Sequence, residues 1–291
     1  MFKKLLLSLL VILCYVQTHA QSGYTVQVKI KNATDTVCYL GYPYGDKKYV
    51  QDTATVEKGN VFTFHKADTL DEGIYFIYTP GNVYFEIIGD NQDIYLETDT
   101  TDLVKNLKVK GSPGTVLFRD FQLFMRESQQ QAAALTEKIK TDKANEESYR
   151  EQLSALDKKV KDYRKQLVDN NSSSFAAKLI KATIDIEVPE SPKDENGKEI
   201  DPAFRFNYYR THFFDNTDFS EPGMLRTPIL HQKITEYLEK LTYKHPDSIA
   251  KAAHYIIEKA KADKEVFRYC VVSISNKYET SNIMGMDKVF V

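Results

Sequence analysis

The sequence predicts a segregated α+β fold, with an antiparallel β-sandwich or barrel-like N-terminal domain, a helical hairpin connector and an all-α C-terminal domain. In residues 24–110 apolar side chains recur at every second position, which is the period of half-buried strands. After residue 111 they recur every three or four residues, which is the period of amphipathic helices. A chain of 291 residues that is 42% hydrophobic and 27% charged can form more than one core and is neither disordered nor collagen-like.

Residues 1–20 have the pattern of a secretory signal peptide. Lys3 and Lys4 form a positive start, residues 5–16 are a mostly apolar run, and small residues precede a cleavage site between Ala20 and Gln21. The run is shorter than the roughly 20 residues of a membrane-spanning helix, so we expect cleavage and export rather than an N-terminal anchor. Cleavage changes the formal charge from −2 to −4, and neither value provides the basic excess that nucleic-acid binding uses.

Residues 21–111 form the predicted β domain. Short runs rich in β-branched and aromatic residues alternate with turn-forming clusters, which indicates an antiparallel sandwich or barrel. The segment Glu57-Lys58-Gly59-Asn60 contains the glycine that a tight hairpin turn requires. The eight expected strands are residues 24–31, 36–40, a run ending at 56, 60–65, 74–78, 83–88, 94–97 and 107–110.

Tyrosine is frequent, with 19 Tyr and 16 Phe but no Trp, and many of the tyrosines lie in the predicted β domain. Exposed tyrosines bind peptides, sugars and partner domains because each ring has an apolar face and a polar hydroxyl. Their two-residue spacing is also typical of ordinary sandwich packing, so we expect them to contribute both to the core and to a recognition surface. The candidate interaction surface consists of Tyr42, Tyr44, Tyr49 and Tyr84.

Residues 112–170 form the predicted helical hairpin connector. The segment Gly111-Ser112-Pro113-Gly114 interrupts the strand pattern, and helical spacing follows it. Apolar residues at alternating steps of three and four then form a short heptad seam. The seam spans under three heptads, which favours a hairpin that packs on itself over a dimeric coiled coil, while a scaffold that oligomerises through the seam is a weaker alternative. Its members are Tyr149, Leu153, Leu156, Val160, Tyr163 and Leu167.

Residues 171–291 form the predicted helical domain. Its helices are expected at residues 175–183, 203–214, 228–242, 247–262 and 264–278, with a polar loop at 189–202. The chain closes on apolar residues without a capping signal, so we expect this domain to be truncated at its C-terminal end. We expect an uncovered apolar edge formed by Met284, Met286, Val289, Phe290 and Val291.

The sequence predicts no catalytic, cofactor-binding or metal-binding residue. It contains no P-loop, no G-x-G-x-x-G and no H-E-x-x-H. The acidic loop at 194–199 fails as a calcium loop because Pro192 falls at the first ligand position. After cleavage two cysteines remain, Cys38 and Cys270; they form no C-x-x-C, and we expect two separate buried thiols rather than a disulfide.

Several short motifs distributed over the mature chain resemble the N-terminal accessory region of exported bacterial thiol-disulfide oxidoreductases of the thioredoxin-like (TlpA/ResA) type. This region consists of an uncharacterised β domain and a helical domain. The motifs that carry the resemblance are Tyr44-Gly45-Asp46-Lys47, Val109-Lys110-Gly111-Ser112-Pro113, Leu225-Arg226-Thr227-Pro228, His245-Pro246-Asp247-Ser248 and Gly285-Met286-Asp287.

The resemblance implies a periplasmic or envelope protein of a Gram-negative bacterium whose thioredoxin-like domain, with a C-x-x-C, follows this region. The 291-residue chain would itself be non-catalytic, would contain no cofactor, and would position the redox domain or an envelope protein client. Neither cysteine matches the redox motif of the family. A self-sufficient envelope module that binds a peptide or glycan through the tyrosine-rich β face is the alternative.

Overall fold

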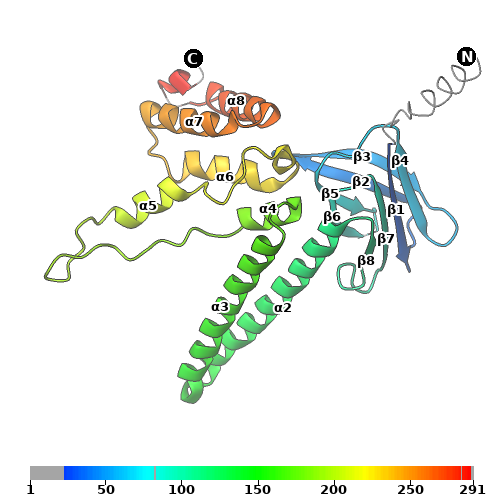
Figure 1. Cartoon of the computed structure of the whole chain (residues 1–291), viewed down its shortest axis with the longest axis horizontal. Helices are drawn as coiled ribbons and strands as arrows, with labels where there is room; N and C mark the ends of the chain where they lie inside the picture. Colours follow the sequence, from blue (N-terminus) through cyan, green and yellow to red (C-terminus); the bar gives the residue numbers. More distant parts are fainter. Residues whose placement is uncertain (1–22, 82, 283, 290–291) are drawn as a thin grey trace, which may run out of the picture.

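The computed structural model describes residues 23–81, 83–282 and 284–289, and it confirms the segregated α+β fold. A two-sheet β-sandwich is followed by a long helical hairpin and then by a layer of shorter helices (Figure 1). The expected signal peptide and its cleavage site at Ala20 and Gln21 lie outside the described residues. In the described part of the chain, no helix has the length and apolar character needed to cross a membrane.

Each sheet of the sandwich contains four strands, in the orders β4-β1-β7-β8 and β3-β2-β5-β6. Side chains of alternate residues point into the space between the sheets, where Val26, Leu40, Phe62 and Ile77 are fully buried. The strands are β1 (Tyr24–Lys31), β2 (Val37–Tyr44), β3 (Lys47–Thr55), β4 (Val61–Lys66), β5 (Gly73–Tyr78), β6 (Tyr84–Gly89), β7 (Asp93–Asp99) and β8 (Lys108–Lys110).

Two features of the pairing differ from the expected antiparallel hairpins. The turn at residues 57–60 forms, with Gly59 and Asn60 at positive φ, but its flanking strands β3 and β4 belong to different sheets. The turn closes a single antiparallel bridge between Glu57 and Val61, as expected, but the strands beyond it diverge into the two layers. In addition, β1 and β7 pair in parallel, although the other strand pairs of the described chain are antiparallel.

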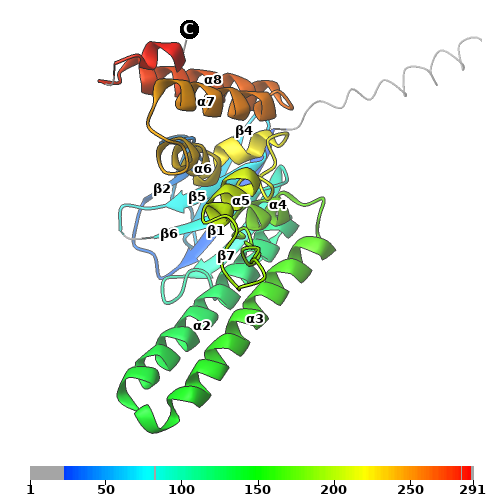
Figure 2. The ribbon, with the colours of Figure 1, turned by 90° about the vertical axis from the view of Figure 1, so that its left-hand side faces the viewer.

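The helical hairpin consists of α2 (Pro113–Thr141) and α3 (Glu146–Asn170), joined by the short 3-10 helix η1 (Lys143–Asn145). The seam of α3 packs against α2 within the same chain: Leu156 and Leu167 are buried, and the Tyr163 ring stacks on Phe124 with 3.9 Å between centroids. The hairpin projects away from the sandwich (Figure 2).

The first turn of α2 is attached to β6 by buried hydroxyl groups. Ser112 caps the helix by accepting from Thr115 N at 3.1 Å, and both hydroxyls donate to the Ile88 carbonyl oxygen at 3.1 Å. Ile88 N donates to Thr115 Oγ1 at 2.9 Å, and Gly114 N donates to the Asp90 carboxylate at 2.6 Å. These bonds fix the direction in which the hairpin leaves the sandwich.

The remaining helices form a second core that extends onto the outer face of sheet β3-β2-β5-β6, where Ile74 and Ile88 contribute to it. Phe175, Phe214, Met224 and other large apolar side chains fill this core. The polar segment between α4 and α5 is an exposed loop, as expected. The elements are α4 (Phe175–Ala182), α5 (Phe204–His212), η2 (Pro222–Arg226), α6 (Pro228–Glu239), α7 (Pro246–Ala260), α8 (Lys264–Glu279) and η3 (Met286–Val289).

The segment after α8 is only partly the uncovered apolar edge that the sequence predicts. Met284 is 95% exposed, but Met286 is 2% exposed and belongs to the helical core, against which Val289 also packs. Phe290 and Val291 lie outside the described residues. Lys288 Nζ contacts the Asp247 carboxylate at 2.9 Å, and Gly285 lies against Pro246. The first turn of α7 therefore covers part of this segment, a long-range contact that local periodicity does not reveal.

The two cysteines are separate buried thiols, as predicted. Cys38 belongs to the core of the sandwich and Cys270 to the helical core, and both are fully inaccessible. Burial raises the pKa of each thiol to about 12.

Candidate functional site

The tip of the β2–β3 hairpin docks on the helical layer. Gly45, at the tip, has a φ of +62°, and its N–H donates to the Leu225 carbonyl oxygen at 2.9 Å. A Cβ atom at this position would lie 2.0 Å from the Tyr269 hydroxyl oxygen of α8. Both the backbone conformation and the close approach therefore require glycine here.

Charged and aromatic side chains surround this contact. Tyr44 donates its hydroxyl hydrogen to Glu265 at 3.0 Å, and its ring meets the Tyr269 ring edge-on at 5.8 Å. Arg226, which is 13% exposed, forms an ion pair at 2.5 Å with Asp71 of the sandwich. The two parts of the chain are therefore joined by polar contacts as well as by the shared apolar core.

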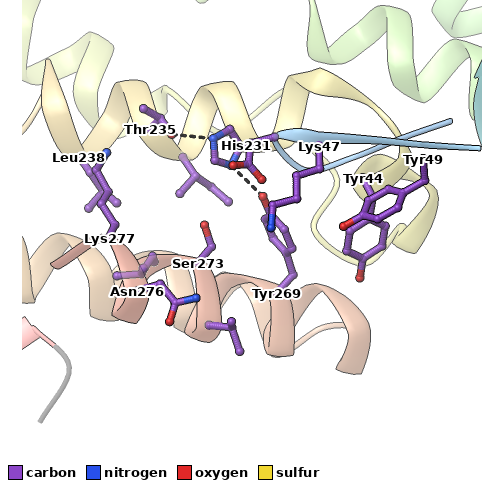
Figure 3. Close-up of a pocket in the computed structure, with 14 residues that line it drawn as sticks. Tyr44, Lys47, Tyr49, His231, Thr235, Leu238, Tyr269, Ser273, Asn276 and Lys277 are labelled. Atoms are coloured by element: carbon purple, nitrogen blue, oxygen red, sulfur yellow. Dashed lines mark hydrogen bonds between the residues drawn. The ribbon is translucent and has the colours of Figure 1, made fainter. Parts of the chain in front are cut away.

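A cleft of about 530 Å³ lies beside this junction, between the start of β3 and the facing surfaces of α6 and α8 (Figure 3). The strand side contributes Asp46, Lys47 and Tyr49, and the helices contribute His231 and Tyr269. The volume lies within the range of about 300–1,000 Å³ that is common for small-molecule sites.

A hydrogen-bonded chain of side chains forms one wall of the cleft. His231 Nδ1 and the Tyr269 hydroxyl are 2.7 Å apart, and His231 Nε2 is 3.4 Å from Thr235 Oγ1. Burial raises the pKa of Tyr269 to about 12, which keeps the phenol neutral, so the Tyr269 hydroxyl can donate to His231. Because both ring nitrogens have protein partners, His231 orients Tyr269 and offers no free base to a ligand.

Three polar residues of the cleft lining, which we call the rim, have free hydrogen-bonding capacity in their side chains: Asp46, Lys47 and Asn276. The side chains of Asp46, Lys47 and Asn276 are exposed, and none of the three has a hydrogen bond or ion pair within the described chain. Lys277, by contrast, forms an ion pair with Glu239 on α6. The rim therefore has unpaired groups of both charge signs and one unpaired amide.

A second exposed feature is an aromatic face on the outer side of sheet β3-β2-β5-β6. Tyr39 stacks on Tyr78, and Phe76 stacks on Tyr84, each with 5.8 Å between ring centroids. Lys48 Nζ lies 5.6 Å from the Phe76 centroid and 5.7 Å from the Tyr84 centroid. This face continues the surface that the helices cover at Ile74 and Ile88.

The four tyrosines of the candidate interaction surface lie on two faces of one sheet. Tyr42 pairs with Tyr49 across β2 and β3, and their rings stack at 5.7 Å. Tyr44 has the same strand parity as Tyr42 and contacts the helices. Tyr84 pairs with Tyr78, which pairs with Tyr39, so it lies on the opposite face. The structure thus places Tyr44 and Tyr49 in the lining of the cleft and Tyr84 on the aromatic face.

Sequence reasoning did not identify His231 and Tyr269 as residues of this site. The apolar spacing of α6 and α8 predicts both helices without using His231 or Tyr269, so nothing local singles these two residues out. More than 180 residues also separate them from Tyr44 in the chain. The available signal was Gly45 in the motif Tyr44-Gly45-Asp46-Lys47, because a glycine at positive φ marks a turn or a close approach.

No metal site is evident in the part of the chain that the structure describes, where no three His, Cys, Asp or Glu side chains come together. Within the acidic loop, Asp194 accepts hydrogen bonds from Asn196 N and Lys198 N at 2.9 Å, which is an ordinary solvated turn.

Two family models match the chain. Residues 24–118 match a domain of unknown function, DUF4369, and residues 152–291 match another domain of unknown function, DUF5106. No curated protein and no solved structure matches the chain. The cleft lies between the two matched regions, because its strand side belongs to the first and its helices belong to the second.

Proposed function

We propose that this chain is the non-catalytic accessory region of an envelope thiol-disulfide oxidoreductase of the thioredoxin-like type, and that it positions the redox domain or its client. The observation that carries the proposal is the docked β2–β3 tip, where two segments of the resemblance, residues 44–47 and 225–228, are in contact. A junction held by Gly45, Tyr44 and Arg226 makes the sandwich and the helices one support. Such a support is suited to holding another domain or a client in place rather than to catalysing a reaction.

The state of the thiols supports a non-catalytic role. Thiol-disulfide exchange requires an accessible thiolate and a resolving thiol nearby. Cys38 and Cys270 are fully buried in different cores, and burial raises the pKa of each to about 12. Neither thiol can supply the attacking sulfur without unfolding around it.

Export is part of the proposal. Residues 1–20 would act as the signal peptide, and the mature chain would begin at Gln21 in the periplasm or envelope of a Gram-negative bacterium. The intact mass of protein recovered from the periplasmic fraction of an expressing cell tests this step. A mass that retains residues 1–20 would contradict it.

The natural reading frame tests the accessory role. An in-frame C-x-x-C within about one hundred codons after Val291, the size of a small domain, is the expected result. In the full-length protein, replacing the second cysteine of that motif with serine should trap a mixed disulfide with the client. A frame that contains no such motif would refute the assignment to this enzyme family.

The aromatic face favours a second candidate function, a self-sufficient envelope binding module for a peptide or glycan. Tyr78 is 42% exposed and Tyr84 is 45% exposed, so two neighbouring aromatic side chains on this strand pair are open to a ligand. Replacing Tyr84 with alanine should reduce capture of envelope material by the purified chain, whereas replacing the exposed Tyr95 on the other sheet should not. Equal capture by both variants would count against this candidate.

A further inference from the structure

We propose that the cleft between the β2–β3 tip and helices α6 and α8 binds a short neutral oligosaccharide. This proposal goes beyond the accessory role and does not depend on it, because it rests on the cleft alone. The cleft is formed by both regions of the chain that match a family model, so it exists only when the two are docked.

The walls of the cleft are held in place before any ligand arrives. Gly45 is fixed by its bond to Leu225, and the Tyr269 ring is oriented by His231 and packed against the glycine. A preformed site loses little conformational entropy when a ligand binds. This organisation distinguishes the cleft from a chance hollow between two surface elements.

The unpaired groups of the rim match the hydrogen-bonding needs of sugar hydroxyls. Each hydroxyl both donates and accepts, so a site for several hydroxyls needs donors and acceptors close together. The Asp46 carboxylate only accepts, the Lys47 ammonium only donates, and the Asn276 amide does both. Within the described chain these three side chains form no hydrogen bond or ion pair, so all of their donors and acceptors can bind a ligand.

The charge distribution disfavours an ionic ligand. The unpaired charges of the lining, Asp46 and Lys47, have opposite signs, and Lys277 is neutralised by Glu239. An anion would meet the Asp46 carboxylate, and a cation would meet the Lys47 ammonium, whereas a neutral polyhydroxyl compound can use both. The lining therefore favours a ligand without net charge.

Aromatic side chains supply the apolar contact that a sugar ring requires. Tyr49 is 43% exposed and lies beside Tyr44 at one end of the cleft, and Tyr269 also belongs to the lining (Figure 3). The C–H groups on one face of a pyranose ring pack on an aromatic ring while its hydroxyls stay at the edge. The combination of tyrosine rings with a mixed polar rim is what an oligosaccharide would use.

Saturation-transfer difference NMR with maltotriose, cellotriose and triacetylchitotriose as probes tests the proposal on the purified chain. We expect saturation of the ring protons of at least one trisaccharide, with binding about tenfold weaker in Tyr49→Ala, which corresponds to the loss of one aromatic contact. Asp46→Asn should also weaken binding. Asp46 is exposed, so Asp46→Asn should unfold at the temperature of the unmodified chain. Tyr49→Ala also loses the stacking of Tyr49 on Tyr42, a small loss of stability, and should remain folded at the temperature of the binding measurement.

Tyr95→Ala is the matched control, because Tyr95 is 41% exposed and lies on β7 of the other sheet. Its binding should equal that of the unmodified chain. The proposal is overturned if none of the three sugars binds with a dissociation constant below about 1 mM, or if Tyr49→Ala binds as well as Tyr95→Ala. Tyr49-dependent binding of hexalysine or hexaglutamate in place of the sugars would also overturn it. None of these outcomes bears on the reading-frame test of the accessory role.

Discussion

Replacing Gly45 with alanine should undock the β2–β3 tip from the helices. The substitution places a side chain on a residue whose φ is +62°, which costs about 1–2 kcal/mol. The new Cβ would also lie 2.0 Å from the Tyr269 hydroxyl oxygen, so the tip must move. Movement breaks the bond from Gly45 N to the Leu225 carbonyl oxygen, which contributes about 0.5–1.5 kcal/mol.

The expected loss in unfolding free energy is about 2–4 kcal/mol, because displacement of the tip also weakens the bond between Tyr44 and Glu265. Gly59→Ala is the matched control, since Gly59 also has positive φ, at +85°, but a Cβ atom there would meet nothing within 4 Å. The control should lose only the cost of a side chain at positive φ, about 1–2 kcal/mol, and should keep the contacts of the tip. Urea unfolding followed by far-ultraviolet circular dichroism measures both losses.

Hydrogen exchange locates the loss within the molecule. In Gly45→Ala the amides of β2 and β3 near the tip and those of the first turns of α8 should exchange faster, while the strands around Phe62 remain protected. If Gly45→Ala and Gly59→Ala lose equal stability and show the same exchange pattern, the tip is not docked as described, and the cleft beside it loses its preformed wall.

Three further outcomes are expected. The native chain should not accelerate insulin reduction by dithiothreitol, and Cys38 and Cys270 should react with a thiol reagent only after denaturation. Catalysis that disappears when either cysteine is replaced by serine would contradict the burial of these thiols. Because burial raises the pKa of Tyr269, its contribution to stability is fully present below pH 10 and is lost as the pH rises toward about 12. Tyr269→Phe should therefore show a smaller fall in urea midpoint over that pH range. An equal fall in both proteins would mean that the Tyr269 hydroxyl is not buried as described. Leu156→Ala should lower the free energy of unfolding by about 2–3 kcal/mol, as measured by thermal or urea unfolding, whereas Lys158→Ala, at an exposed position, should change it by less than about 0.5 kcal/mol. Equally small effects of the two substitutions would mean that the seam is not packed against α2.

The local elements of this protein follow from its sequence. Period-two alternation locates the strands, as in Tyr24–Lys31, and the three-four spacing that ends at Leu167 locates the second helix of the hairpin. Both patterns arise because a strand or helix must place its apolar side chains on one side, and that requirement acts between near neighbours. The separate burial of Cys38 and Cys270 follows from the same patterns.

Strand pairing, by contrast, depends on contacts that local periodicity does not encode. The turn at 57–60 has the residues of a hairpin, yet β3 pairs with β2 and β4 pairs with β1. The alternation of β1 is the same whether its neighbour β7 runs parallel or antiparallel, so the parallel pair could not be inferred from it. The choice is made by the packing of both sheets around one core.

The cleft depends both on local sequence patterns and on contacts between distant parts of the chain. The amino-acid order predicts a strand at residues 36–40, but β2 continues to Tyr44 and Gly45 forms the turn into β3. The meeting of this turn with Tyr269, and the orientation of that tyrosine by His231, arise only in the folded chain. Docking depends on the shapes of two surfaces far apart in sequence, and on a hydrogen bond whose donor and acceptor become neighbours only after both regions have folded.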